Sequence, residues 1–257
     1  NILLNDGTLA NLSFHEDNNI IITKVQKIMI QSQIPLNRIL ALTTPERTDS
    51  YTIISEPWAH TFTLITKDKI FKPKKQHSSA ISVIVADGDY CVTGSDDSSI
   101  IVWNLKKEKA QSLIVAHMYP ISILSVSSIL QVVLSCDNDG NVVLSSLKTG
   151  SFLQKYKIDK LPKLALMSSL GFCIFIYEEA NSTRITLHDM NGRKLEEVVI
   201  EGKCTASCIM ENSDSTSYIA IALDNEFVYI FRIYDLYEIF CTKVDGIIRE
   251  MAYYNYS

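Results

Sequence analysis

Three short apolar runs lie close together between residues 77 and 105, and polar turn residues bound each of them. The runs are residues 81–85, 90–92 and 100–103, and the turns between them are 86–89 and 95–98. Asp, Gly and Ser fill most of these turns, a composition that reverses the chain. β-branched residues dominate the runs and favour strands. The pattern therefore predicts three antiparallel strands joined by tight turns.

The polar residues of the same stretch resemble those of one blade of a WD-repeat β-propeller. Trp103-Asn104 stands in place of the Trp-Asp pair, and Gln76-His77 in place of Gly-His. The resemblance places four side chains in a buried hydrogen-bond relay: His77, Thr93 (or Ser95, on the same face by alternation), Asp97 and Trp103. In that relay the indole N–H bonds to a hydroxyl, the hydroxyl meets the imidazole, and the carboxylate holds the imidazole.

The same pattern recurs along the chain. His117 follows His77 by 40 residues and Asp139 follows Asp97 by 42, which predicts a second relay containing His117 and Asp139. The positions equivalent to Trp103 are Ser145, His188 and Phe231, at spacings of 42, 43 and 43 residues. Such spacings match the roughly 40–45-residue period of propeller blades. Since Ser145 replaces Trp, the second relay lacks its indole.

The repeat predicts one all-β domain over residues 1–257, a WD-repeat β-propeller of four-stranded blades. The expected units are residues 1–30, 36–76, 77–116, 117–159, 160–202, 203–244 and a partial unit 245–257, so the first and last are incomplete. Residues 246–252 are expected to form a lone first strand. The family type has seven blades, whereas the sequence gives six to seven. Either the last blade is missing from this chain, which we favour, or six blades close on the terminal strand.

Composition narrows the class of protein. Apolar residues make up 47% of the chain, enough for a sizeable core, and the net charge of −5 argues against a nucleic-acid partner. No apolar run approaches the roughly 18 residues of a membrane span, and no signal peptide is visible. Because the first residue is Asn, we expect a piece of a longer polypeptide. The six scattered cysteines indicate reduced thiols of a cytoplasmic protein, with no metal or cofactor site.

Candidate catalytic groups have structural interpretations. His77 and Asp97 with Thr93 could form a triad, but they recur with the blade period, which favours a structural relay. His188 occupies a position usually filled by an aromatic residue, so core packing is favoured over metal binding. No Gly-rich phosphate loop or carboxylate pair is present. Lysine clusters at 72–75 and 106–109 are expected on opposite faces as solvated charge. The sequence therefore predicts no enzyme.

From about residue 58 to 251 the chain resembles the C-terminal propellers of BEACH-domain proteins such as neurobeachin. The matching stretches are residues 57–59, 90–95 with 101–103, 132–135 with 150–153, 173–178, 190–195 and 245–251. The resemblance implies BEACH and PH-like domains upstream in the same polypeptide. It also implies a cytoplasmic protein, peripheral to endosomal or lysosomal membranes, that acts in vesicle and lysosomal traffic or autophagy. Its association with membranes would be indirect.

The leading functional hypothesis is a non-enzymatic scaffold that binds other proteins or short peptide segments. A closed ring of sheets leaves rigid loops that display side chains at fixed positions. The candidate partner-binding residues lie in loops on the side of the relay histidines: Ser79, Asp96, Tyr119 and Asn138. The alternative is a WD-repeat subunit of an unrelated complex, such as a coat, a chromatin complex or a ubiquitin-ligase adaptor. A hydrolase built on a propeller would need clustered acids or histidines, which the sequence does not show.

Overall fold

The structure is a computed structural model that describes residues 2–3, 8–14, 20–27, 39–43, 51–55, 58–65, 70–211, 216–249 and 251. Side chains are described for residues 53, 55, 58–64, 71–211, 216–249 and 251. No helix of these residues is long and apolar enough to cross a membrane.

The described strands form one three-stranded and five four-stranded antiparallel sheets. The first sheet contains β1 (Ile2–Leu3), β2 (Thr8–Phe14) and β3 (Ile20–Lys27). The second contains β4 (Ile39–Thr43), β5 (Tyr51–Ile54), β6 (Thr63–Ile65) and β7 (Ile70–Phe71), and the third β8 (Ile81–Asp87), β9 (Tyr90–Ser95), β10 (Ile100–Asn104) and β11 (Lys109–Ile114).

The remaining three sheets follow in chain order. They are β12 (Ile121–Ser127), β13 (Val132–Asp137), β14 (Asn141–Ser146) and β15 (Phe152–Lys157); β16 (Leu164–Met167), β17 (Cys173–Glu178), β18 (Ser182–His188) and β19 (Lys194–Glu201); and β20 (Cys204–Glu211), β21 (Ser217–Leu223), β22 (Phe227–Arg232) and β23 (Glu238–Lys243). The prediction of four-stranded antiparallel units is thereby confirmed.

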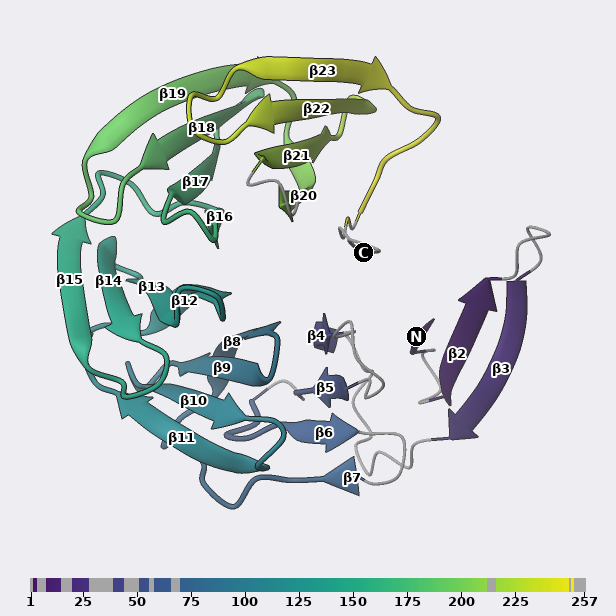
Figure 1. Cartoon of the computed structure of the whole chain (residues 1–257), viewed down its shortest axis with the longest axis vertical. Helices are drawn as coiled ribbons and strands as arrows, with labels where there is room; N and C mark the ends of the chain where they lie inside the picture. Colours follow the sequence, from purple (N-terminus) through teal and green to yellow (C-terminus); the bar gives the residue numbers. More distant parts are fainter. Residues whose placement is uncertain are drawn as a thin grey trace.

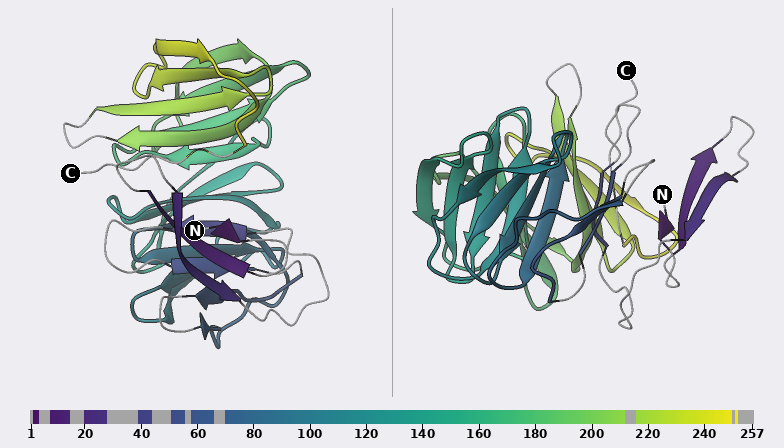
Figure 2. Two further views of the ribbon diagram at one scale, coloured as in Figure 1. Left: turned by 90° about the vertical axis from the view of Figure 1, so that its right-hand side faces the viewer. Right: turned by 90° about the horizontal axis from the view of Figure 1, so that it is seen from below.

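The sheets stand around a common axis (Figure 1), with the first strand of each four-stranded sheet innermost and the fourth outermost. The strands run between two faces on which the connecting loops lie (Figure 2). In each four-stranded antiparallel sheet, the turn between the second and third strands and the link to the next sheet lie on the same face. We call this the relay-histidine face, since His77 and His117 lie in such links. The other turns lie on the opposite face.

The core consists of layers between neighbouring sheets. Ile101 and Trp103 of β10 pack in a cluster with Ile53 and Leu64 of the preceding sheet. Val102, on the other side of β10, packs in a second cluster with Val133 of the following sheet. All of β10 is buried because both of its sides are covered.

One irregularity recurs at the position that the sequence singles out. Trp103 pairs with Cys91 on the second strand, and the pairing with the fourth strand shifts between Val102 and Trp103. The same shift occurs just before Ser145, His188 and Phe231. A β-bulge re-aims the following side chain, so these four residues occupy equivalent positions in their sheets.

The C-terminal segment differs from the sequence prediction. Residues 244–249 and 251 form no strand, although residues 246–252 were expected to begin another unit. Gly246 has a φ of 110°, a conformation outside the extended region that a strand requires.

Candidate functional site

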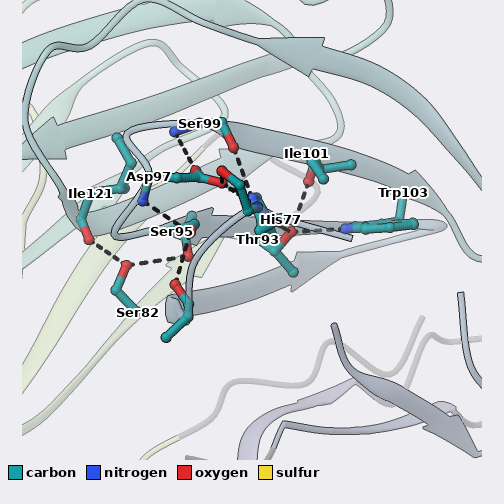
Figure 3. A network of polar contacts seen from close by, with 12 residues as sticks. His77, Ser82, Thr93, Ser95, Asp97, Ser99, Ile101, Trp103 and Ile121 are labelled. Atoms are coloured by element: carbon teal, nitrogen blue, oxygen red, sulfur yellow. Dashed lines mark hydrogen bonds and ion pairs between the residues drawn. The ribbon is translucent and has the colours of Figure 1, made fainter. Parts of the chain in front are cut away.

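The polar network of sheet β8–β11 links four side chains in series (Figure 3). Trp103 Nε1–H donates to Thr93 Oγ1 at 2.9 Å, and Thr93 Oγ1 lies 2.8 Å from His77 Nε2. His77 Nδ1 lies 2.8 Å from Ser99 Oγ and 3.6 Å from Asp97 Oδ1. The predicted carboxylate of Asp97 therefore lies beside the imidazole, and Ser99 is a second and closer partner that the sequence analysis did not name.

The proton positions in this network can be argued from the indole N–H of Trp103, which can donate a hydrogen bond but cannot accept one. Thr93 Oγ1 therefore accepts from the indole. The hydroxyl hydrogen of Thr93 has two acceptors in reach, His77 Nε2 at 2.8 Å and the carbonyl of Ile101 at 3.4 Å, and the shorter contact favours His77. His77 then carries its proton on Nδ1, facing Ser99. Burial lowers the pKa of His77 by more than Asp97 raises it, which favours the neutral imidazole.

Asp97 ties the turn after β9 to the link that precedes β8. Its carboxylate accepts hydrogen bonds from the backbone N–H of Ser78 at 2.7 Å, the Ser78 hydroxyl at 2.8 Å and the backbone N–H of Ser99 at 2.9 Å. Burial raises the pKa of Asp97, but the hydrogen bonds from Ser99 and Ser78 outweigh it and hold the pKa below its usual range. Asp97 is therefore an ionised tie between two loops of the relay-histidine face.

The second relay contains a different carboxylate from the one predicted. His117 Nδ1 lies 3.0 Å from Asp137 Oδ2, and His117 Nε2 lies 2.7 Å from Ser135 Oγ. The carboxylate of Asp139, the predicted partner, is not bonded to His117 and forms an exposed ion pair with Lys157 at 2.8 Å. The prediction placed the acid two residues too late.

The strand register explains the difference. Asp137 pairs with Ile121 at the end of its strand, just as Ser95 pairs with Ile81 in the preceding sheet. Ser95 instead donates its hydroxyl to the carbonyl of Ala80. A carboxylate at this place reaches the imidazole directly, so the second relay needs no acid in the turn. Asp137 lies two residues after Ser135 and so on the same face of its strand, a signal that the sequence did contain.

The positions equivalent to Trp103 have three different environments. Ser145 is fully buried and its hydroxyl has no hydrogen-bond partner. His188 is buried, stacked on Tyr156 with ring centroids 6.4 Å apart and edge-on to Phe175 at 5.1 Å. Burial lowers the pKa of His188. Phe231 stacks on Tyr229 at 5.9 Å. His188 thus packs as an aromatic ring.

The candidate partner-binding residues all lie on the relay-histidine face. Asp96 and Asn138 are exposed in the turns before β10 and β14, Tyr119 is 48% exposed, and Ser79 is half-buried. The N–H of Asp96 donates to the carbonyl of Ala80, and that of Asn138 to the carbonyl of Pro120. Each turn is therefore bonded to the link beside it.

The buried polar groups are poorly placed for chemistry. His77, Thr93 and His117 are 4%, 0% and 6% exposed, so a substrate has no access to them. Within the described residues, no three His, Cys, Asp or Glu side chains come together as metal ligands. All six cysteines lie in the described ranges as free thiols. Burial raises the pKa of Cys204 to about 11, which leaves its thiol protonated and a weak nucleophile.

Comparisons with known proteins support the fold. No protein-family model matches the sequence. Pre-mRNA-processing factor 19 of Caenorhabditis elegans is 24% identical over 104 residues, a stretch that covers 40% of this chain and 21% of that protein.

Two solved structures are similar in fold. The computationally designed Ika8 protein matches with a TM-score of 0.62 and 12% identity, over 83% of this chain and 64% of that one. The β-propeller domain of Cps50 (Swd1) from Myceliophteria thermophila matches with a TM-score of 0.51 and 17% identity, over 66% and 58% of the two chains. Together with the sheet arrangement, these matches define the fold as a β-propeller of four-stranded sheets.

Proposed function

We propose that this propeller is a non-enzymatic scaffold that binds other proteins, or short segments of them, on the relay-histidine face. The observation that carries the proposal is the way the loops of this face are held. Asp97 joins the turn before β10 to the link before β8, and buried imidazoles anchor two successive links. Their outer side chains remain exposed, as at Asp96 and Tyr119. Rigid loops with exposed side chains bind with little loss of conformational entropy.

The test is a double substitution, Asp96→Ala with Tyr119→Ala, in a pulldown from cell extract. Both side chains are exposed, so the expected result is weaker capture of a partner at an unchanged melting temperature. The matched control is Lys107→Ala with Ile129→Ala, two exposed residues of the opposite face. Full capture by the first variant together with weakened capture by the control would show that the partner binds the opposite face, and would contradict the proposal.

We further propose that the propeller belongs to a BEACH-like protein of vesicle and lysosomal membrane traffic or autophagy. The support is the sequence resemblance from residue 58 to 251. The proposal includes a seven-bladed ring, a cytoplasmic location peripheral to endosomal or lysosomal membranes, and BEACH and PH-like domains upstream in the same polypeptide. The complete open reading frame around this segment tests the proposal. An upstream sequence with no BEACH domain would contradict it.

The alternative, a WD-repeat subunit of an unrelated complex, has a specific observation in its favour. The curated relative that matches is named a pre-mRNA-processing factor. Size-exclusion chromatography of the native protein with mass spectrometry of the associated chains distinguishes the two. Stable co-elution with a fixed set of other subunits favours the alternative.

A further inference from the structure

The two tryptophans of the chain have opposite environments. Trp103 is 2% exposed in the relay, whereas Trp58 is 79% exposed in the turn between β5 and β6. That turn lies on the relay-histidine face, because it joins a second strand to a third. A large aromatic side chain left in water loses the favourable free energy that its burial would supply. Its exposure therefore needs a cause in the surrounding structure.

The backbone around Trp58 is held from the next sheet. The carbonyl of Ala59 accepts the N–H of Ile81 at 2.8 Å, and the carbonyl of His60 accepts the N–H of His77 at 2.9 Å. Phe62 is buried and packs edge-on against Trp103, with ring centroids 5.1 Å apart. These contacts fix the turn to the first relay in an arrangement that leaves Trp58 exposed.

The backbone conformation of Trp58 is itself unfavourable. Its φ is 65°, in the left-handed region that bulky residues rarely adopt. Such conformations persist where the surroundings enforce them, and they concentrate at sites that bind ligands. Trp58 is thus held in a strained conformation with its ring in solvent.

Three lysines lie in the link that runs beside this turn. Lys72, Lys74 and Lys75 are exposed, while Pro73 between them is buried and anchors the segment. The link leads into His77, whose N–H is bonded to His60, two residues from Trp58. Lys75 and His60 both lie near enough to the His77 imidazole to lower its pKa electrostatically, although burial lowers it most. Trp58 thus lies in a turn that is bonded to the link carrying Lys72, Lys74 and Lys75, and we call these four residues the Trp–Lys surface.

The lysines of this surface, like Lys148 and Lys155, have no acidic partner among the described residues, whereas several other lysines do. Lys157 pairs with Asp139, and Lys163 with Glu178. Among the residues that the structure describes, no acidic group pairs with Lys72, Lys74 or Lys75. The chain as a whole carries a net charge of −5, so this positive surface stands against an acidic background. Such a surface attracts a short acidic segment more than a long polyanion, which the rest of the protein would repel.

We propose that the Trp–Lys surface binds an acidic peptide segment of a partner protein, with an apolar side chain of that segment packed on Trp58. The inference rests on the proposed scaffold function and assigns it a partner chemistry. Tryptophan is enriched among the residues that dominate binding energy, and lysines at its rim speed association with an acidic partner. Met118, 87% exposed in the link before β12, is another exposed apolar side chain of the same face.

The test is a binding titration of the whole chain by fluorescence anisotropy. The probe is a fluorescein-labelled peptide rich in Asp and Glu with a single Leu, and a Lys-rich peptide with the same Leu is its counterpart. The acidic peptide should bind, and its affinity should fall as the salt concentration is raised. Trp58→Ala and Lys74→Glu with Lys75→Glu should each weaken binding by about tenfold or more. Trp58→Phe should retain most of the affinity.

The matched control changes the same charge on the opposite face. Lys107→Glu with Lys109→Glu alters two exposed lysines there and should leave acidic-peptide binding unchanged. Thermal melts of every variant establish that it is folded. The inference is overturned if the acidic and Lys-rich peptides bind equally. It is also overturned if the control variant loses as much affinity for the acidic peptide as the Lys74/Lys75 variant does. Binding of phosphatidylserine vesicles without binding of the acidic peptide overturns it as well.

A pulldown separates this inference from the proposed scaffold function. The scaffold proposal stands and the acidic-segment inference fails when Asp96→Ala with Tyr119→Ala loses the partner while the Trp58 and Lys74/Lys75 variants keep it. Both fail when every one of these variants keeps it in full. Loss of the same partner in the Trp58 and Lys74/Lys75 variants, together with the peptide result, supports both.

Discussion

Asp137 Oδ2 lies 3.0 Å from His117 Nδ1, and both side chains are completely shielded from solvent. The Asp137 carboxylate also accepts the backbone N–H groups of Asp139 and Asn141, each at 3.0 Å. Burial raises the pKa of Asp137, but hydrogen bonds from His117 and Asn141 outweigh it and hold the pKa below its usual value. One side chain thus closes a turn and orients a buried imidazole.

Removal of that carboxylate should therefore destabilise the protein. We expect Asp137→Ala to lower the free energy of unfolding by roughly 1.5–3 kcal/mol or more, because it leaves buried donors unpaired. Urea unfolding monitored by circular dichroism measures the change. Asp139→Asn is the control, and its unfolding midpoint should stay within error because it affects only an exposed ion pair with Lys157 and a long, exposed hydrogen bond from Asn141. A larger effect at Asp139 than at Asp137 would contradict the relay described above.

The equivalent positions 103 and 145 should respond very differently to truncation. Trp103→Ala removes a large buried ring and leaves the hydroxyl of Thr93 without its donor, at a cost of roughly 3–5 kcal/mol. Ser145→Ala removes a buried hydroxyl that has no partner, so the expected change is small or stabilising. Thermal melts of the two variants provide the comparison, and equal tolerance of both would mean that the Trp103 relay contributes little.

Acid should destabilise the fold in two stages. Burial lowers the pKa of His77, His117 and His188 below the ordinary value of 6.5. The unfolded chain therefore binds more protons than the folded one in this range. The contribution of the three neutral imidazoles to the free energy of unfolding is fully present above about pH 6.5 and is lost as the pH falls through the lowered pKa values of the folded state. Asp97 and Asp137, whose pKa values are also lowered, extend the loss below the ordinary carboxyl value of 3.8.

Unfolding titrations at a series of pH values measure this dependence. His188→Phe should make it shallower between about pH 7 and 5, because one buried imidazole no longer resists protonation. Phe231 shows that a phenyl ring fits the equivalent position. A free energy of unfolding that is constant or rises as the pH falls through this range would contradict the neutral state of the three imidazoles.

Gly94 should resist substitution for a steric reason. A Cβ at this position would lie 2.6 Å from Ile121 Cγ2 and 2.9 Å from Val83 Cγ1, and Ile121 is almost fully buried. We expect Gly94→Ala to cost roughly 1–3 kcal/mol through overpacking between two sheets. Ile121→Ala in the same chain should recover part of that loss beyond additivity, which a double-mutant cycle by urea unfolding measures. Strict additivity would show that the two sheets are less tightly packed here.

The succession of strands could be predicted from local pattern, and part of the site could not. The relay of His77, Thr93 and Trp103 was expected from the resemblance to a WD-repeat blade, and strand alternation fixed the faces of Thr93 and Trp103. The carboxylate of the second relay required the register of β12 on β13, since Asp137 and Asp139 are both polar residues near one turn. Ser99 was missed for the same reason: only the folded turn brings its hydroxyl to His77.

The sequence alone determined the repeating four-stranded sheet and the equivalence of positions 103, 145, 188 and 231, because strand alternation and turn chemistry are local properties. Tertiary structure decided that Asp137 rather than Asp139 meets His117, and that Trp58 stays exposed. Those outcomes depend on contacts between sheets, such as the bonds from His77 and Ile81 that hold the Trp58 turn open. At these contacts between sheets, groups far apart in the chain come together, and the local sequence pattern does not specify which groups will be neighbours.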